Sequence, residues 1–319
     1  MQFYDFKEIE ERVILIGVQT EQDEDVAASL DELEELAATA GAVTVGKVIQ
    51  NREAVHPGTY IGKGKIEEVA ALLAAYDANG VICDDELSPA QMNNLERELD
   101  CKVMDRTLLI LDIFAGRATT SEGKIQVELA QLRYRSARLV GLRESLSRLG
   151  GGIGTRGPGE KKLETDRRLI RTRISALKAE LAQVEKHREL IRGKRTRGNL
   201  KTAAIVGYTN AGKSTLLNTL TGAGILAEDK LFATLDPTTR VLELKDGQQI
   251  LLTDTVGFIR KLPHHLVEAF KSTLEEAKYA DYIIHVVDAS NPQAEIQMHT
   301  VYETLRELGA TGKKIITLL

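Results

Sequence analysis

The sequence lacks tryptophan altogether, has only two cysteines, and is only 4% aromatic. Cys83 and Cys101 lie far apart and match no CxxC or metal-ligand spacing, so we interpret them as reduced structural thiols. No stretch approaches the roughly 18 consecutive apolar residues of a membrane helix, and the N-terminus has no basic-then-apolar signal pattern. We therefore expect a cytoplasmic protein without stable membrane insertion, and peripheral membrane association stays open.

What the sequence does contain is an ordinary globular composition with an uneven distribution of charge. Its 319 residues, 43% hydrophobic and 28% charged, suggest two or three soluble domains. The net charge is only −5, yet residues 121–198 hold 20 Lys and Arg against 9 Asp and Glu, which leaves 22 against 38 elsewhere. A basic segment between acidic flanks favours a polyanionic partner such as nucleic acid. A solvated pair of charged helices is the alternative at this point.

The first 118 residues alternate between short apolar runs and helical patterns, which predicts a small parallel α/β domain. The strands are expected at 13–18, 42–45, 80–83 and 101–104. The helices are expected at 25–40, 65–76 and 89–99, with a further helix at 107–118. A loop rich in glycine and lysine at 56–65 could hold a phosphate or an RNA backbone, or could simply connect two elements.

Residues 119–198 have apolar side chains at three- and four-residue spacing in two stretches, which predicts an antiparallel helical hairpin. The first apolar seam runs from Ile125 to Leu149 and the second from Ile170 to Ile191. A glycine-rich tip at 150–162 joins them. We expect a projecting basic arm that contacts RNA phosphates through outward-facing arginines, because guanidinium groups bind phosphates bidentately. Those arginines are Arg133, Arg135, Arg138, Arg143, Arg167, Arg168, Arg171 and Arg173.

Residues 199–319 begin with an apolar strand and the motif Gly207-x-x-x-x-Gly212-Lys213-Ser214. This is a phosphate-binding loop in its strand-loop-helix context. The glycines let backbone N–H groups approach phosphate, Lys213 neutralises the β and γ phosphates, and Ser214 binds Mg²⁺. The alternative, an ordinary strand-to-helix turn, does not account for every fixed position of the motif. We predict a doubly wound α/β domain here.

Two downstream stretches complete the predicted nucleotide switch. Asp254-Thr-Val-Gly257 ends an apolar strand, where Asp254 holds Mg²⁺ through water and the Gly257 N–H binds the γ-phosphate. In the polar loop at 232–240, Thr234 is the expected second Mg²⁺ ligand, with Thr238 and Thr239 as alternates. The residues predicted to contact the nucleotide are Gly207, Tyr208, Thr209, Asn210, Ala211, Gly212, Lys213, Ser214, Phe232, Ala233, Thr234, Leu235, Asp236, Asp254, Thr255, Val256 and Gly257.

These three motifs, with the loop at 58–64 and the tip at 150–160, resemble the HflX family of ribosome-associated GTPases along nearly the whole chain. The resemblance implies a GTP-dependent protein, and we expect it to be monomeric. It implies binding to the large ribosomal subunit and its rRNA, with the hairpin tip near the peptidyl transferase region. It also implies roles in splitting ribosomes and in rescuing stalled ones, especially under stress.

The family's guanine-reading Asn-Lys-x-Asp motif is expected after the strand at 315–319, where the sequence stops. Guanine specificity is therefore implied by the resemblance alone. We expect this GTPase domain to be incomplete, with weakened GTP affinity and an exposed edge around Leu318 and Leu319.

Phe258 stands where GTPases that orient their own water carry glutamine. A phenyl ring cannot orient water, so we assign no catalytic side chain and expect slow hydrolysis that the ribosome accelerates. Asn210 resembles the asparagine that helps bind an activating K⁺ in related GTPases. Two other classes stay open: an ATP-driven RNA-remodelling enzyme and a nucleotide-independent RNA-binding module.

Overall fold

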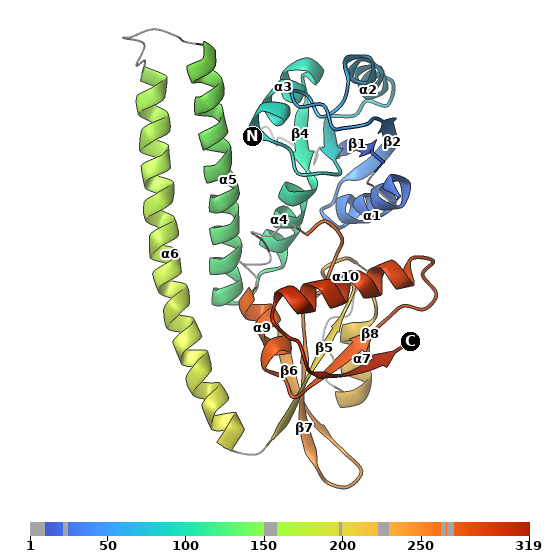
Figure 1. Ribbon diagram of the computed structural model, residues 1–319, viewed down its shortest axis with the longest axis vertical. Coiled ribbons are helices and arrows are strands. Elements are labelled where there is room, and N and C mark those ends of the chain that lie inside the picture. The colour runs from blue at the N-terminus through green and yellow to red at the C-terminus, as the bar shows by residue number, and fades with distance from the viewer. Residues whose placement is uncertain are drawn as a thin grey trace, which may run out of the picture. The chain divides into compact units, whose positions relative to one another are not determined.

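A computed structural model describes residues 10–21, 25–149, 158–197, 200–222, 230–262, 266 and 271–319 (Figure 1). Contacts divide the chain into two compact units. One comprises Met1–Ile113 and Ala137–Lys161, and the other comprises Phe114–Ser136 and Lys162–Leu319. The domain boundaries expected after residues 118 and 198 stay a prediction. Along the described part of the chain, no helix is both long enough and apolar enough to cross a bilayer.

The first unit is built on a four-stranded parallel sheet in the order β2-β1-β3-β4, which confirms the parallel α/β prediction. Its strands are β1 (Arg12–Gln19), β2 (Val43–Asn51), β3 (Gly80–Cys83) and β4 (Lys102–Asp105). Its helices are α1 (Val26–Thr39), α2 (Lys63–Ala75), α3 (Pro89–Leu99) and α4 (Arg106–Arg117), the last of which runs on into the second unit. Six consecutive residues of β1 are buried, as expected for a central parallel strand covered on both faces.

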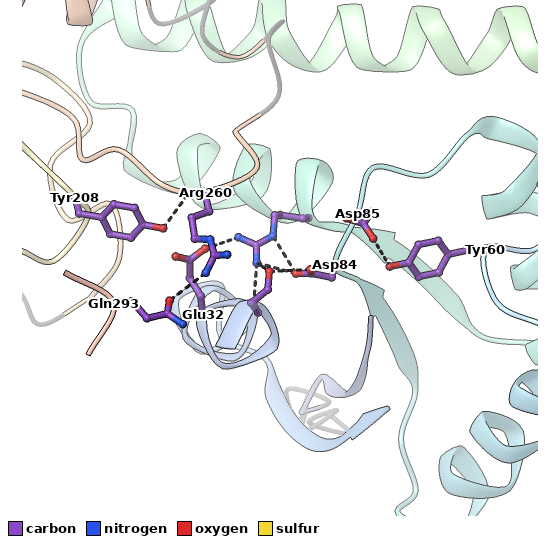
Figure 2. A network of polar contacts seen from close by, with 9 residues as sticks. Glu32, Tyr60, Asp84, Asp85, Tyr208, Arg260 and Gln293 are labelled. Carbon is purple, nitrogen blue, oxygen red and sulfur yellow. Dashed lines mark hydrogen bonds and ion pairs between the residues drawn. The ribbon is translucent and has the colours of Figure 1, made fainter. Parts of the chain in front are cut away.

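A charged cluster lies inside the first unit, where sequence patterns gave no sign of it (Figure 2). The Arg106 side chain is buried and donates to Asp84 at 2.8 Å and to Glu32 at 2.6 Å. The buried Ser29 hydroxyl donates to the same Asp84 carboxylate at 2.8 Å. Burial opposes the charge of Arg106, but the carboxylates of Asp84 and Glu32 raise its pKa overall, so the guanidinium stays charged.

The predicted helical hairpin is confirmed as α5 (Ser121–Leu149) and α6 (Pro158–Arg197). Two ion pairs show that the helices run antiparallel: Glu122 contacts Arg188 at 3.0 Å, and Glu128 contacts Arg173 at 2.7 Å. Residues 150–157 of the predicted glycine-rich tip lie outside the described residues, and residues 158–162, predicted as part of the tip, instead belong to the first turns of α6.

The burial pattern of the hairpin differs from the single narrow seam expected on each helix. Val127, Ala130 and Tyr134 are buried in α5 besides the predicted Leu129, so its first half packs on more than one side. Two of the arginines expected to face outward do not. Arg138 pairs with the buried Asp105 of the first unit, and the Arg167 side chain is itself buried. Spacing alone did not reveal that these cations have partners within the fold.

The second unit contains a five-stranded sheet in the order β6-β7-β5-β8-β9, in which only β6 is antiparallel. The strands are β5 (Lys201–Gly207), β6 (Thr238–Glu243), β7 (Gln249–Asp254), β8 (Tyr282–Val286) and β9 (Lys314–Leu318). The helices are α7 (Lys213–Thr221), α9 (Lys271–Tyr279) and α10 (Ala294–Glu307). All five residues of the edge strand β9 are exposed, as is Leu319. Residues 238–240, predicted as loop, belong to β6.

Candidate nucleotide-binding site

The site begins where β5, the central strand of its sheet, turns into α7. A Cβ atom at Gly207 would lie 2.3 Å from the backbone oxygen of Val286 in β8, so only glycine fits there. Gly212 has φ +87°, in the left-handed region that glycine adopts without strain. These two positions let the loop curl so that the backbone N–H groups at the start of α7 face one hollow, the arrangement that binds phosphate.

Lys213 is held inside this loop. Its side chain is buried, and Nζ donates to the backbone oxygen of Tyr208 at 2.6 Å. Burial lowers the pKa of Lys213 to about 8, although the nearby Asp254 carboxylate raises it. A buried cation in a loop of N–H donors is suited to a polyanion such as the β and γ phosphates of a nucleotide.

Three oxygen-bearing side chains converge beside Lys213. The Ser214 hydroxyl donates to Asp254 Oδ2 at 2.6 Å and lies 2.8 Å from the hydroxyl of Thr234. Asp254 is fully buried, and its Oδ1 meets no hydrogen-bond donor within the part of the chain that the structure describes. Burial raises the pKa of Asp254, although the hydrogen bond from Ser214 and the positive charge of Lys213 act to lower it. Two hydroxyls beside a buried carboxylate with a spare oxygen fit a hard divalent cation.

The two alternate threonines lie elsewhere. Thr238 and Thr239 are the first residues of β6, and the Thr239 hydroxyl lies 2.9 Å from that of Thr253 in β7. Of the three threonines considered, Thr234 is the one whose hydroxyl meets Ser214.

Gly257 packs directly against the phosphate loop. A Cβ atom at this position would lie 2.6 Å from Thr209 Cα and 3.0 Å from Lys213 Nζ. The neighbouring backbone is fixed by two hydrogen bonds: the Phe258 N–H donates to Gly207 O at 3.1 Å, and the Thr209 N–H donates to Phe258 O at 2.7 Å. Because the Phe258 side chain is buried, its ring anchors this segment.

Arg260, which sequence reasoning did not select, extends this connection (Figure 2). Its backbone N–H donates to the Tyr208 hydroxyl at 2.8 Å, and its guanidinium donates to Gln293, just before α10, at 3.1 Å. Tyr208 therefore links the phosphate loop to the segment after Gly257. No motif marks Arg260, because its contacts depend on residues far away in the sequence.

The hollow between these segments is open to solvent, and about 400 Å³ within and in front of it is free of protein atoms. Ten predicted residues line it: Thr209, Asn210, Gly212, Lys213, Ser214, Phe232, Ala233, Thr234, Thr255 and Gly257. Thr215 and Lys230 also line it and were not predicted. The other predicted residues, Gly207, Tyr208, Ala211, Leu235, Asp236, Asp254 and Val256, do not line it. Leu235 and Val256 are buried, and the Asp236 carboxylate bonds to Thr119 and Thr120.

Three family models match the chain. They are described as GTP-binding GTPase N-terminal at residues 27–115, GTP-binding GTPase Middle Region at 117–195, and 50S ribosome-binding GTPase at 202–319. Among solved structures, a GTP-binding protein from the archaeon Sulfolobus solfataricus in complex with GDP is similar. It is 27% identical with a TM-score of 0.50, and the match covers 96% of this chain and 81% of that one.

Curated relatives named GTPase HflX are closer in sequence. The relative from Lacrimispora saccharolytica is 74% identical over 314 residues, which cover 98% of this chain and 74% of that protein. The relative from Escherichia coli is 48% identical over 309 residues, which cover 97% and 72%. The phosphate loop, the GTPase family model and these relatives agree, and the chain belongs to the HflX family of ribosome-associated GTPases.

Proposed function

We propose that this GTPase binds the large ribosomal subunit and couples its nucleotide state to the splitting of ribosomes or the rescue of stalled ones. The observation that carries the proposal is the convergence of Ser214, Thr234 and Asp254 next to the buried Lys213, within a chain that also carries a basic helical hairpin. The first feature fits a switch that reads the γ-phosphate, and the second fits an rRNA partner. We expect the protein to act in the cytoplasm, where ribosomes work.

In this proposal, the side chains of Ser214, Thr234 and Asp254 would hold Mg²⁺. When bound, Mg²⁺ would neutralise the negative charge of the nucleotide's phosphates during hydrolysis. Lys213 and the backbone N–H groups of the loop hold the same phosphates. The N–H of Gly257 binds the γ-phosphate, and the close packing of Gly257 on Thr209 transmits the loss of that phosphate to the loop.

We expect slow intrinsic hydrolysis because Phe258, whose phenyl ring cannot orient water, stands where GTPases that orient their own water carry glutamine. Phe258 is buried and serves as an anchor, so truncating it should not remove a catalytic group. Loss of most ribosome-independent turnover in Phe258→Ala would argue against this if Phe258→Leu, which keeps an apolar side chain at the anchor, loses it as well.

K⁺ is the proposed activator, held with the help of Asn210, which lines the hollow. Asn210 has φ +60°, a conformation that an asparagine tolerates better than most residues. Turnover should therefore be faster in K⁺ than in Na⁺ at equal ionic strength. Equal rates in the two salts would remove K⁺ from the mechanism.

Binding to the large subunit is supported by the charge of the hairpin and by the description of the matched family, 50S ribosome-binding GTPase. Arg135, Arg168 and Arg171 are exposed on the described parts of α5 and α6. Exposed arginines on helices can bind the phosphates of rRNA, and such electrostatic binding weakens as the salt concentration rises.

Sedimentation with purified ribosomal subunits tests the proposal. We expect more of the chain to pellet with large subunits when a non-hydrolysable GTP analogue is bound than when GDP is bound. In the Lys213→Ala variant, the two nucleotides should give the same amount of pelleted chain. Competition between GTP and ATP separates a GTPase from an ATP-driven enzyme. Association that ignores nucleotide state would make the chain a simple RNA-binding module and overturn the switch.

A further inference from the structure

The loop that carries Thr234 is attached at its far end to the beginning of α5. The Asp236 carboxylate accepts four hydrogen bonds from the residues just before that helix. Oδ2 accepts from the N–H and hydroxyl of Thr119 at 3.0 and 2.7 Å and from the N–H of Thr120 at 2.9 Å. Oδ1 accepts from the Thr120 hydroxyl at 2.6 Å. Although partial burial opposes ionisation, these bonds lower the pKa of Asp236.

Thr120 is in turn the residue that caps α5. Its hydroxyl accepts from the Gly123 N–H at 2.9 Å, and its backbone oxygen accepts from the Lys124 N–H at 3.0 Å. The negative charge of Asp236 thus lies at the positive end of the helix dipole, where it is favoured. Gly123 lets the loop come this close, since a Cβ there would lie 2.4 Å from Asp236 Oδ1.

The near end of the same loop is attached to the phosphate loop and to α4. The Phe232 N–H donates to the Thr209 hydroxyl at 2.8 Å, and the buried Phe232 ring meets the Phe114 ring edge to face at 4.7 Å. Phe232 has φ +54°, a conformation that a bulky residue adopts only where its surroundings hold it. Phe114 lies near the end of α4, and Thr119 and Thr120 lie just after α4, so residues 114–120 hold both ends of the loop.

Thr234 stands between these two attachments, with its hydroxyl 2.8 Å from Ser214. We propose that Asp236 is a positioning residue that ties Thr234 to the first turn of α5, so that the nucleotide site and the helical arm are energetically coupled. This inference rests on the proposed role of Thr234 as a Mg²⁺ ligand. Because such coupling is reciprocal, a partner that holds α5 in this arrangement strengthens the binding of GTP, and bound GTP stabilises the start of the arm.

Gly123→Ala tests this coupling without touching the nucleotide site. The added methyl group displaces Asp236, while alanine suits a helix better than glycine, so helix stability alone predicts no loss. In the full chain, affinity for a non-hydrolysable GTP analogue with Mg²⁺ should fall by roughly 5- to 50-fold, a typical range for coupled sites. GDP affinity, which does not need Thr234, should change less than about twofold. Gly116→Ala in α4 is the matched control, because nothing lies within 4 Å of its added Cβ.

Asp236→Ala should reproduce the Gly123→Ala defect, and combining the two should add little further loss, because both break the same contact. The inference is overturned if Gly123→Ala and Asp236→Ala bind the analogue as tightly as the unmodified chain, or if they weaken the analogue and GDP equally.

Thr234→Ala separates this inference from the proposed function. If Thr234→Ala raises the Mg²⁺ concentration needed for analogue binding while the Gly123 and Asp236 variants do not, the coupling alone is wrong. If Thr234→Ala leaves the Mg²⁺ requirement unchanged, the proposed metal role of Thr234 fails, and the coupling falls with it.

Discussion

At the scale of single residues, the nucleotide site depends on close approaches that leave no space for a side chain. Gly257 shows this best, because its missing Cβ would overlap the phosphate loop at Thr209 and crowd Lys213. A Gly257→Ala variant must push these segments apart. Since small displacements of positioned groups strongly reduce rates, we expect GTP turnover to fall by about 10- to 100-fold, as measured by phosphate release.

Gly46→Ala is a suitable comparison for Gly257→Ala. Its added Cβ would come no closer than 3.9 Å to its neighbour in β1, so turnover should stay near that of the unmodified chain. Equal turnover for Gly257→Ala and the unmodified chain would show that the packing of Gly257 on Thr209 does not matter to the reaction.

The convergence of Ser214, Thr234 and Asp254 could be predicted from the sequence, because the phosphate loop and the strand that ends in Asp254 are local motifs with fixed geometry. The partners of Asp236 could not. Thr119 and Thr120 lie more than a hundred residues away in the sequence, and nothing in the pattern around them indicates a bound carboxylate. Arg138 and Arg167 were placed on outer helix faces for the same reason, since helical spacing does not reveal tertiary partners.

At the scale of elements, the hairpin was predictable because its apolar residues recur at helical spacing over many turns. What spacing could not give is which of these residues carry the packing. In α6, Leu177 is fully buried, whereas its seam neighbours Ile174 and Leu181 are only partly buried. Leu190, which lies outside the predicted seam, is 68% exposed.

Leu177→Ala should therefore lower the free energy of unfolding of the second unit by about 2–5 kcal/mol, the usual cost of truncating a buried leucine. Leu190→Ala on the same helix should change it by less than about 0.5 kcal/mol. Denaturant titration followed by circular dichroism measures both. Similar costs for the two variants would mean that α6 does not pack through Leu177.

At the scale of the whole molecule, the chain consists of two compact units, and the nucleotide site lies entirely in the second. A ligand stabilises only the part of a protein that binds it. GDP at about 100 times its Kd should add roughly 2.7 kcal/mol to the stability of that part. By scanning calorimetry, we expect GDP to raise the temperature of one unfolding transition and leave another in place.

A single transition that shifts as a whole on addition of GDP would instead show that the two units unfold together. In that case, Arg106→Leu should lower the temperature of the same transition, because it leaves the buried Asp84 without its cation. If the units unfold separately, Arg106→Leu should lower the temperature of only the transition that GDP leaves unchanged.

The central claim is that this chain is a slow GTPase whose partner completes its reaction. The most direct measurement is GTP turnover at increasing concentrations of purified large ribosomal subunits, with small subunits as the comparison. We predict a low intrinsic rate that rises to saturation with large subunits and does not respond to small ones. A rate that is already high without ribosomes, or that large subunits leave unchanged, would contradict the account.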